Sequence, residues 1–294
     1  MNPLEVIKSK KILVSDGAWG TMLFKYGLQP GDCPEEWNLT HSNTIKEIAK
    51  GYINAGSDII CTNSFGGNKL KLMQYGLQDK TGQINRTAAS LSRQAAEEKF
   101  VFGSIGPTGK FLITGEVTEQ ELYDSFLQQA ASLKAGGADL ILFETFYDLD
   151  EARTAIRSVK ENLQIPVACT FTFNRLPDGS YKTIMGVSPE AFTSVMMELE
   201  TDLLGSNCGL GFQNMVEIAK SIRKVNSNIP MLVQANAGLP QNINGEMVYS
   251  ESPEFITPYI RELINTGVNI IGGCCGTTPE HIRMIRKMVN EHIG

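Results

Sequence analysis

The sequence predicts a single-domain (β/α)8 barrel, a TIM barrel of the α/β class, that occupies residues 1–294. Three observations lead to this prediction. Eight short apolar runs alternate along the chain with eight amphipathic segments of helical period. A length of 294 residues suits one barrel, which typically needs about 250. The spacing leaves no linker for a second domain, although an open doubly wound sheet would use the same repeat with fewer strands.

The predicted strands are four to six residues long and consist mostly of β-branched or other apolar residues. They show no strict alternation of apolar and polar residues, which is typical of parallel strands that are buried on both faces. In chain order they are Ile12–Ser15, Asp58–Thr62, Val101–Ser104, Leu140–Glu144, Val167–Thr172, Leu203–Asn207, Met231–Gln234 and Asn269–Gly272.

The predicted helices lie between these strands and after the last one. Thr278, Pro279 and Glu280 mark the start of the last helix, because they supply an N-cap, a proline at the first helical position and an acid in the first turn. In chain order the helices are Asn43–Ala55, Ile84–Glu98, Glu119–Ala135, Leu149–Asn162, Pro189–Glu198, Met215–Val225, Pro253–Asn265 and Pro279–Asn290. Two connections, residues 63–83 and Asn174–Gly186, are longer than the repeat needs. Both follow strands, where barrel enzymes enlarge their active-site loops.

Charge and hydropathy exclude several classes of protein. The net charge of −6 argues against a nucleic-acid binder, whose domain is usually basic. No apolar run approaches the roughly 18 residues of a membrane span, and no basic segment followed by an apolar one opens the chain. We therefore expect a cytoplasmic protein that binds neither nucleic acid nor a membrane.

Cysteine outnumbers histidine, with six cysteines against three histidines. Disulfides are rare in the cytosol, and few histidines leave little material for histidine catalysis or an all-histidine metal site. If a metal binds, sulfur is therefore its expected ligand. We expect no ligand role for the histidines: two lie at the start of predicted helices and one in the tail. The cysteines are at positions 33, 61, 169, 208, 274 and 275, and the histidines at 41, 281 and 292.

Three of the cysteines follow predicted strands and so point to one end of the barrel. Cys208 follows the sixth strand, and the adjacent Cys274 and Cys275 follow the eighth. Three thiolates leave one tetrahedral position open, as in a catalytic zinc site. A buried apolar role and a redox pair are the alternatives, but adjacent cysteines form only a strained disulfide. We keep the buried apolar role for Cys61 and Cys169, and Cys33 is not assigned.

Two carboxylates occupy the same end of the predicted barrel. Asp16 follows the first strand and Glu144 ends the fourth. Each alone would suit a helix cap or a solvated acid, but beside three cysteines the pair favours a receptor for an ammonium group. The glycine loop at Gly103–Gly109 is not a phosphate loop, because Ser104 stands at the first required glycine position and Phe111 where Ser or Thr should follow the lysine.

Taken together, the strand-end segments resemble the homocysteine S-methyltransferase family from about residue 10 to 290. The most specific of them are Asn207-Cys208 and the final Gly-Gly-Cys-Cys-Gly run with its Thr-Thr-Pro continuation. The segments that carry the resemblance are Asp16–Thr21, Thr62–Gly66, Gly106-Pro107, Glu144-Thr145, Asn207-Cys208, Asn236–Pro240 and Gly272–Pro279.

The resemblance implies a zinc-dependent barrel in which Cys208, Cys274 and Cys275 bind Zn²⁺. It also implies that the homocysteine sulfur takes the fourth zinc position as a thiolate. A free thiol has a pKa of about 8.5, so it is mostly protonated at neutral pH until zinc binds it. The substrate ammonium group would then face Asp16 or Glu144. Its carboxylate would bind the backbone N–H groups of the loop formed by Gly17, Ala18 and Trp19, with Asn236 as a neighbouring polar contact.

The methyl donor is the open question. Thr62–Gly66 and the Gly-Gly-Cys-Cys-Gly-Thr-Thr-Pro run resemble most closely the homocysteine module of cobalamin-dependent methionine synthase. The 294 residues contain no Asp-x-His-x-x-Gly segment that could bind a corrinoid. We therefore expect methionine formation from homocysteine and a methyl group carried by a separate corrinoid protein or methylcobalamin. Betaine or S-methylmethionine is the alternative donor. A non-enzymatic zinc- and thiol-binding module of a larger methyltransferase complex is the alternative function, and another small thiol the alternative acceptor.

Overall fold

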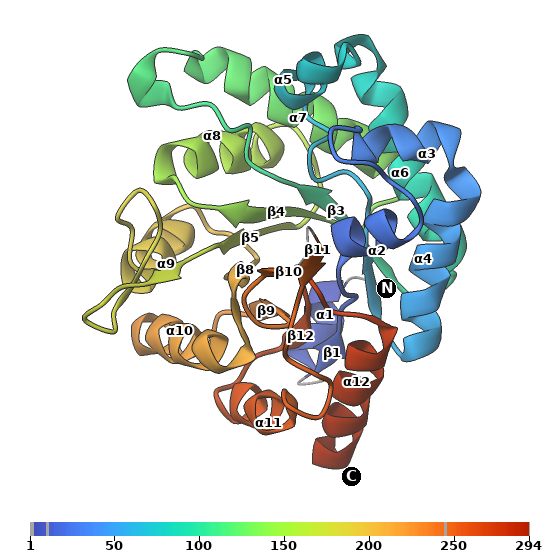
Figure 1. The fold of residues 1–294 in the computed structure, drawn as a ribbon. Coiled ribbons are helices and arrows are strands. Elements are labelled where there is room, and N and C mark those ends of the chain that lie inside the picture. The colour runs from blue at the N-terminus through green and yellow to red at the C-terminus, as the bar shows by residue number, and fades with distance from the viewer. Residues whose placement is uncertain (1–2, 10–11, 244–245, 294) are drawn as a thin grey trace.

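The protein is a closed barrel of eight parallel strands, seen in the centre of Figure 1 with helices around it. The computed structural model describes residues 3–9, 12–243 and 246–293. The strand order is β1-β12-β9-β8-β5-β4-β3-β2, and a parallel bridge between Ser15 and Ile59 joins its two ends. The predicted (β/α)8 barrel is therefore confirmed, and the open doubly wound alternative is wrong. The strands are β1 (Leu13–Val14), β2 (Ile59–Cys61), β3 (Phe100–Ile105), β4 (Leu140–Phe146), β5 (Val167–Phe171), β8 (Leu203–Gly211), β9 (Met231–Asn236) and β12 (Ile270–Gly273).

Each predicted helix is present, with shifted ends in several cases. Helix α10 begins three residues earlier than expected, because β8 runs on to Gly211 and leads directly into it. Helix α11 begins four residues later, because a turn closed by the Ser252 hydroxyl and the Phe255 N–H precedes it. The eight are α4 (Ser42–Ala55), α6 (Thr81–Ala96), α7 (Glu119–Ala135), α8 (Leu149–Lys160), α9 (Pro189–Glu198), α10 (Phe212–Val225), α11 (Thr257–Asn265) and α12 (Pro279–Ile293).

Short helices, 3-10 turns and strands that the sequence pattern did not predict lie at both ends of the barrel. Two antiparallel hairpins, β6–β7 and β10–β11, extend the connections that follow β5 and β9. The second hairpin shows that residues 237–256 form a third long connection. The short elements are α1 (Pro3–Lys8), α2 (Trp19–Lys25), α3 (Trp37–Thr40), α5 (Lys69–Leu72), β6 (Asn174–Arg175), β7 (Tyr181–Lys182), β10 (Gln241–Ile243), β11 (Glu246–Val248) and single 3-10 turns at Pro34–Glu36, Met73–Tyr75, Gln78–Lys80 and Leu112–Thr114.

The barrel interior changes from apolar to polar along the strands. Its lower part is an apolar cluster with one residue or two from each strand, closed from below by Ile7 of α1. Two residues further along several strands, the inward position is polar: Ser104 follows Phe102, Thr170 follows Ala168, and Gln234 follows Leu232. Since side chains alternate in direction along a strand, these polar residues point into the upper end of the barrel. The fold thus places a polar floor beneath the loops that follow the strands.

The outer faces of the strands pack against the helices and form the larger apolar cluster. This explains why the strands lack alternation in the sequence, since the outward residues are apolar as well. Within the described residues, no helix is long and apolar enough to cross a membrane.

Candidate functional site

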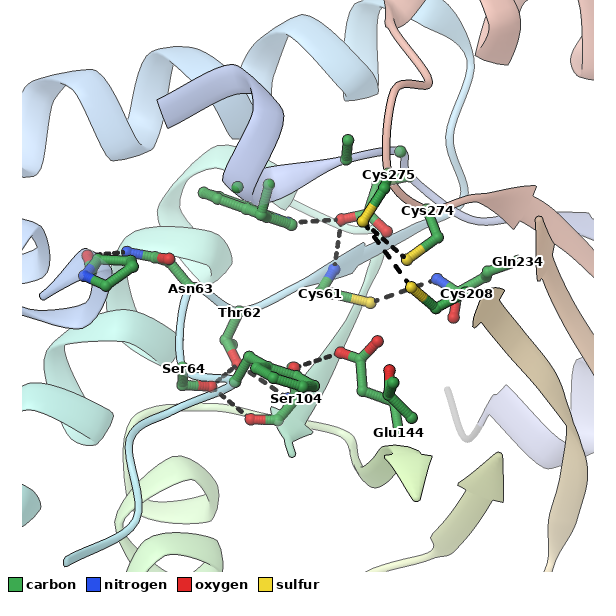
Figure 2. Close-up of a pocket in the computed structure, with 18 of the residues that line it drawn as sticks. Cys61, Thr62, Asn63, Ser64, Ser104, Glu144, Cys208, Gln234, Cys274 and Cys275 are labelled. Carbon is green, nitrogen blue, oxygen red and sulfur yellow. Dashed lines mark hydrogen bonds between the residues drawn. The ribbon is translucent and has the colours of Figure 1, made fainter. Parts of the chain in front are cut away.

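Three cysteine sulfurs meet at the upper end of the barrel, on the right of Figure 2. The Sγ atoms of Cys208, Cys274 and Cys275 lie within 4.8 Å of one another. The Sγ of Cys275 lies 3.8 Å from that of Cys208 and 4.0 Å from that of Cys274. All three side chains are partly exposed and unbridged. The structure thus gathers the three cysteines that the strand-end argument selected.

The Cys274–Cys275 pair is held in a tight turn between β12 and α12. The Cys274 N–H donates to the carbonyl of Ala235, 2.7 Å away, and its carbonyl accepts from the hydroxyl of Thr277, also at 2.7 Å. The turn requires glycine at position 273, because a Cβ there would lie 2.1 Å from the Thr277 hydroxyl oxygen. The turn thereby directs two consecutive thiols to one point.

The three thiols lie within hydrogen-bonding distance of one another through Cys275. Hydrogen bonds from Cys208 and Cys274 lower the pKa of the Cys275 thiol well below its usual range. The hydrogen bonds that Cys274 makes with Cys208 and Cys275, together with burial, raise the pKa of the Cys274 thiol. Thiols this close together affect one another's ionisation, and a metal ion binds cysteine as the thiolate.

A cavity of about 300 Å³ opens beside the sulfurs. It combines the cysteines, the two candidate carboxylates and an apolar rim that includes Leu23 and Phe65. The lining residues are Asp16–Gly20, Leu23, Pro34, Glu35, Cys61–Phe65, Ser104, Glu144, Thr145, Cys208, Gln234 and Gly273–Cys275.

Asp16 is buried and Glu144 is partly buried, and both line the cavity. Burial raises the pKa of Asp16 to about 6 and that of Glu144 to about 7. Asp16 Oδ2 accepts from the indole Nε1 of Trp19 at 2.9 Å and from the Cys61 N–H at 2.8 Å, whereas its Oδ1 is buried without a partner. Glu144 accepts from the Ser104 hydroxyl (Figure 2). It also accepts from the Asn207 amide at 3.1 Å. Two acceptor groups of this kind favour a cationic ligand.

Comparison with known proteins shows the family to which the chain belongs. A family model described as homocysteine S-methyltransferase matches residues 13–289. The chain belongs to the homocysteine S-methyltransferase family. It is therefore a methyltransferase, and the family supports homocysteine as its substrate.

Solved structures of low sequence identity share the barrel. The metallated form of the homocysteine methyltransferase MmuM from Escherichia coli matches with a TM-score of 0.80 and 21% identity, over 97% of this chain and 99% of that one. Its oxidized form matches with a TM-score of 0.78 and 22% identity, over 98% and 99%. A DHDPS from Cyanidioschyzon merolae with lysine bound gives 0.53 and 12%, over 96% and 75%. At these identities the likeness concerns the fold.

Most residues predicted from the homocysteine methyltransferase resemblance line the cavity. Asp16, Gly17, Ala18, Trp19 and Glu144 do so together with the three cysteines. The Ala18 N–H already donates to the Thr277 hydroxyl at 3.2 Å. Asn236 ends β9 and is buried with its amide oxygen unpartnered, but it is not among the cavity-lining residues.

Other cavity residues were missed by the sequence reasoning. Ser104 and Gln234 line the cavity because each is a polar, inward-facing residue two positions after an apolar inward-facing one. The predicted strands already contained this change from apolar to polar. Cys61 is buried as expected, but it also lines the cavity floor. Cys169 is buried in the core, and so is Cys33 despite its polar surroundings in the sequence. His281 bridges Thr278 and the carbonyl of Glu251, away from the three-sulfur cluster.

Proposed function

We propose that this barrel converts homocysteine to methionine by holding the homocysteine thiolate on a zinc ion bound by Cys208, Cys274 and Cys275. The observation that supports this most directly is that three sulfurs and two carboxylates, those of Asp16 and Glu144, line one cavity. Homocysteine has a thiol at one end and an ammonium group at the other. The thiol would face the three sulfurs, and the ammonium group would face the two carboxylates.

The spacing of the sulfurs supports zinc as the metal. With zinc–sulfur bonds of about 2.3 Å, tetrahedral geometry separates two sulfur ligands by about 3.8 Å. The Sγ atom of Cys275 lies 3.8 and 4.0 Å from those of Cys208 and Cys274, so the thiols need little movement to bind one ion. Three thiolates and no carboxylate or histidine form a soft donor set, which disfavours Mg²⁺ and Ca²⁺. When bound, the zinc would lower the pKa of the substrate thiol and present it as a thiolate.

The rest of the cavity would orient the amino acid. Asp16 Oδ1, which is buried without a partner, and the carboxylate of Glu144 would receive the ammonium group. The N–H groups of Gly17 and Trp19 would receive the carboxylate, since that of Ala18 is engaged by Thr277. A further polar contact between Asn236 and the substrate stays a prediction. These contacts would hold the sulfur in line with an incoming methyl group, which is where positioning contributes to rate.

For the methyl donor we propose a methylated corrinoid on a separate protein. This rests on the likeness of Thr62–Gly66 and Gly272–Pro279 to the cobalamin-dependent branch. The volume of about 300 Å³ is too small for a whole corrinoid, so a corrinoid would have to present its methyl group at the cavity mouth.

A donor competition tests this proposal. We expect the zinc-loaded protein to form methionine from homocysteine faster with methylcobalamin than with betaine, S-methylmethionine or methyl-tetrahydrofolate at equal concentration. Methionine is measured chromatographically, with metal-free protein as the blank. A clearly faster reaction with betaine or S-methylmethionine would replace the corrinoid donor but keep the homocysteine assignment. Zinc binding without methionine from any donor would contradict both.

The affinity for the amino-acid portion of the substrate should fall as the pH falls. Below about pH 7 Glu144, and below about pH 6 Asp16, take up protons and lose the charge that attracts an ammonium group. A raised carboxyl pKa therefore weakens ligand binding on the acid side, by up to about tenfold per pH unit for each group. The probe is L-norleucine, the sulfur-free isostere of methionine, titrated calorimetrically from pH 5.5 to 8.5 with metal content checked after each run. Glu144→Gln should move the onset toward pH 6, and an affinity that stays constant over the whole range would refute the ammonium assignment.

A further inference from the structure

Two residues of the site have a backbone conformation that side chains normally avoid. Thr145 has φ 62° and Cys208 has φ 59°, both in the left-handed region. This is a strained conformation, above all for a β-branched residue such as Thr145. Two other described non-glycine residues, Glu97 and Glu200, share it, but they are exposed and lie after helices. The strain within the barrel is thus confined to the neighbours of a cavity carboxylate and to a candidate metal ligand.

Both strained residues lie in irregular stretches of strand. In β4, Glu144 and Thr145 together stand opposite one residue of β5, Thr170. In β8, Cys208–Leu210 stand opposite one residue of β9, Ala235. Bulges of this kind redirect side chains and occur next to active sites. They allow Glu144 and Cys208 to face the same cavity.

One side chain connects the two bulges. Asn207 precedes Cys208 and is fully buried. Its Oδ1 accepts from the Thr145 N–H at 2.8 Å and from the Thr170 hydroxyl at 2.7 Å. Its Nδ2 donates to the Thr145 hydroxyl oxygen at 2.7 Å and to Glu144 Oε2 at 3.1 Å.

These four hydrogen bonds use both donors and both acceptor positions of the amide. The Thr145 N–H can only donate, so it must face the amide oxygen, and the orientation of the Asn207 side chain is determined. Because every hydrogen-bonding position of this buried amide is occupied, it fixes Glu144 and Thr145 relative to the backbone that leads into Cys208.

We propose that Asn207 is a positioning residue that couples the amino-acid subsite at Glu144 to the metal ligand Cys208, so that occupying either one strengthens binding at the other. This rests on the proposed function, in which Glu144 receives an ammonium group and Cys208 binds zinc. An ammonium group that immobilises Glu144 also immobilises the Asn207 amide through the Nδ2–Oε2 hydrogen bond. The next residue is the strained Cys208, whose sulfur must stay about 3.8 Å from its neighbours for tetrahedral coordination. Linkage then requires the effect to be reciprocal.

The test measures metal affinity without any methyl donor. Cobalt(II) is the probe, because its thiolate charge-transfer absorption reports coordination by cysteine, and affinities come from competition with a chelator. We expect saturating L-norleucine to raise the cobalt affinity of the unmodified protein about fivefold or more, the lower end of typical couplings. Asn207→Ala should weaken cobalt binding about tenfold and abolish the norleucine effect. Thr170→Val, which removes one of the four hydrogen bonds and retains the side-chain shape, should reduce the effect and serves if the Asn207 variant does not fold.

The control is another buried amide outside the cavity. Asn85 in α6 is fully buried, and its Nδ2 donates to the carbonyls of Gly67 and Thr81. Asn85→Ala should lower the melting temperature but leave the cobalt affinity and the norleucine effect unchanged. A purely structural role for Asn207 would likewise lower stability without changing cobalt affinity in the folded fraction, and that result overturns the proposal. If norleucine binds to the unmodified protein but leaves its cobalt affinity unchanged, the coupling is wrong and the proposed function stands. If norleucine does not bind at all, both the coupling and the proposed function are wrong.

Discussion

Replacing Cys275 with alanine is expected to remove the bound metal and to lower the rate of methionine formation about 10³-fold. Cys275 has the central sulfur of the three, with separations of 3.8 and 4.0 Å from the other two, so its loss leaves two ligands that no longer surround an ion. Without zinc, only a few per cent of a thiol with a pKa of about 8.5 is ionised at pH 7, which accounts for a factor of about 30. Loss of the orientation of that thiol accounts for the rest, since misplacement of a reacting group costs about 10²-fold.

The matched control is Cys169→Ala, because Cys169 is a buried core cysteine of β5 that does not line the cavity. It should keep one metal per chain and its activity, with a stability loss of about 1 kcal/mol for the small cavity that it creates. Metal content is measured by elemental analysis of each variant, and methionine formation under identical donor conditions. Full activity of a metal-free Cys275→Ala protein would show that the reaction proceeds without the three-sulfur site.

Local sequence patterns were sufficient for the barrel and for the three sulfurs. A buried parallel strand is a short apolar run wherever it occurs, and the position directly after it is at the cavity end of the barrel. Cys208, Cys274 and Cys275 could therefore be brought together from their places in the chain alone. The same argument placed Asp16 and Glu144 at the cavity.

Contacts between distant strands were beyond such reasoning. Asn207 was noted only as part of a two-residue motif, because its hydrogen bonds to Glu144, Thr145 and Thr170 cross from β8 to β4 and depend on two bulges. No local propensity encodes a bulge that neighbouring strands impose. The burial of Cys33 likewise depends on a cluster with Leu72, Leu77 and Ile84, which are far from it in the sequence. Tertiary contacts thus decided the details that the local pattern left open.

Replacing Glu144 with alanine is expected to raise the KM for homocysteine about 10²-fold while the protein keeps one metal per chain. Glu144 lines the cavity and is partly buried, and in the proposed complex its charge is paired with the substrate ammonium group. Removing one partner of a buried, hydrogen-bonded charge pair costs about 2–5 kcal/mol, and about 2.7 kcal/mol corresponds to 10²-fold. Metal content should persist, because Asn207 keeps its three hydrogen bonds to Thr145 and Thr170.

A second buried carboxylate separates this effect from a general loss of stability. Glu151 is buried and accepts from the N–H and hydroxyl of Thr108, but it does not line the cavity. Glu151→Ala should therefore lower the melting temperature yet change the KM less than about twofold. Steady-state kinetics over a wide range of homocysteine concentration, with metal analysis of the same samples, distinguish the two variants. If Glu144→Ala keeps its metal and an ordinary KM, then Glu144 does not bind the ammonium group and Asp16, whose Oδ1 is buried without a partner, is left as its receptor.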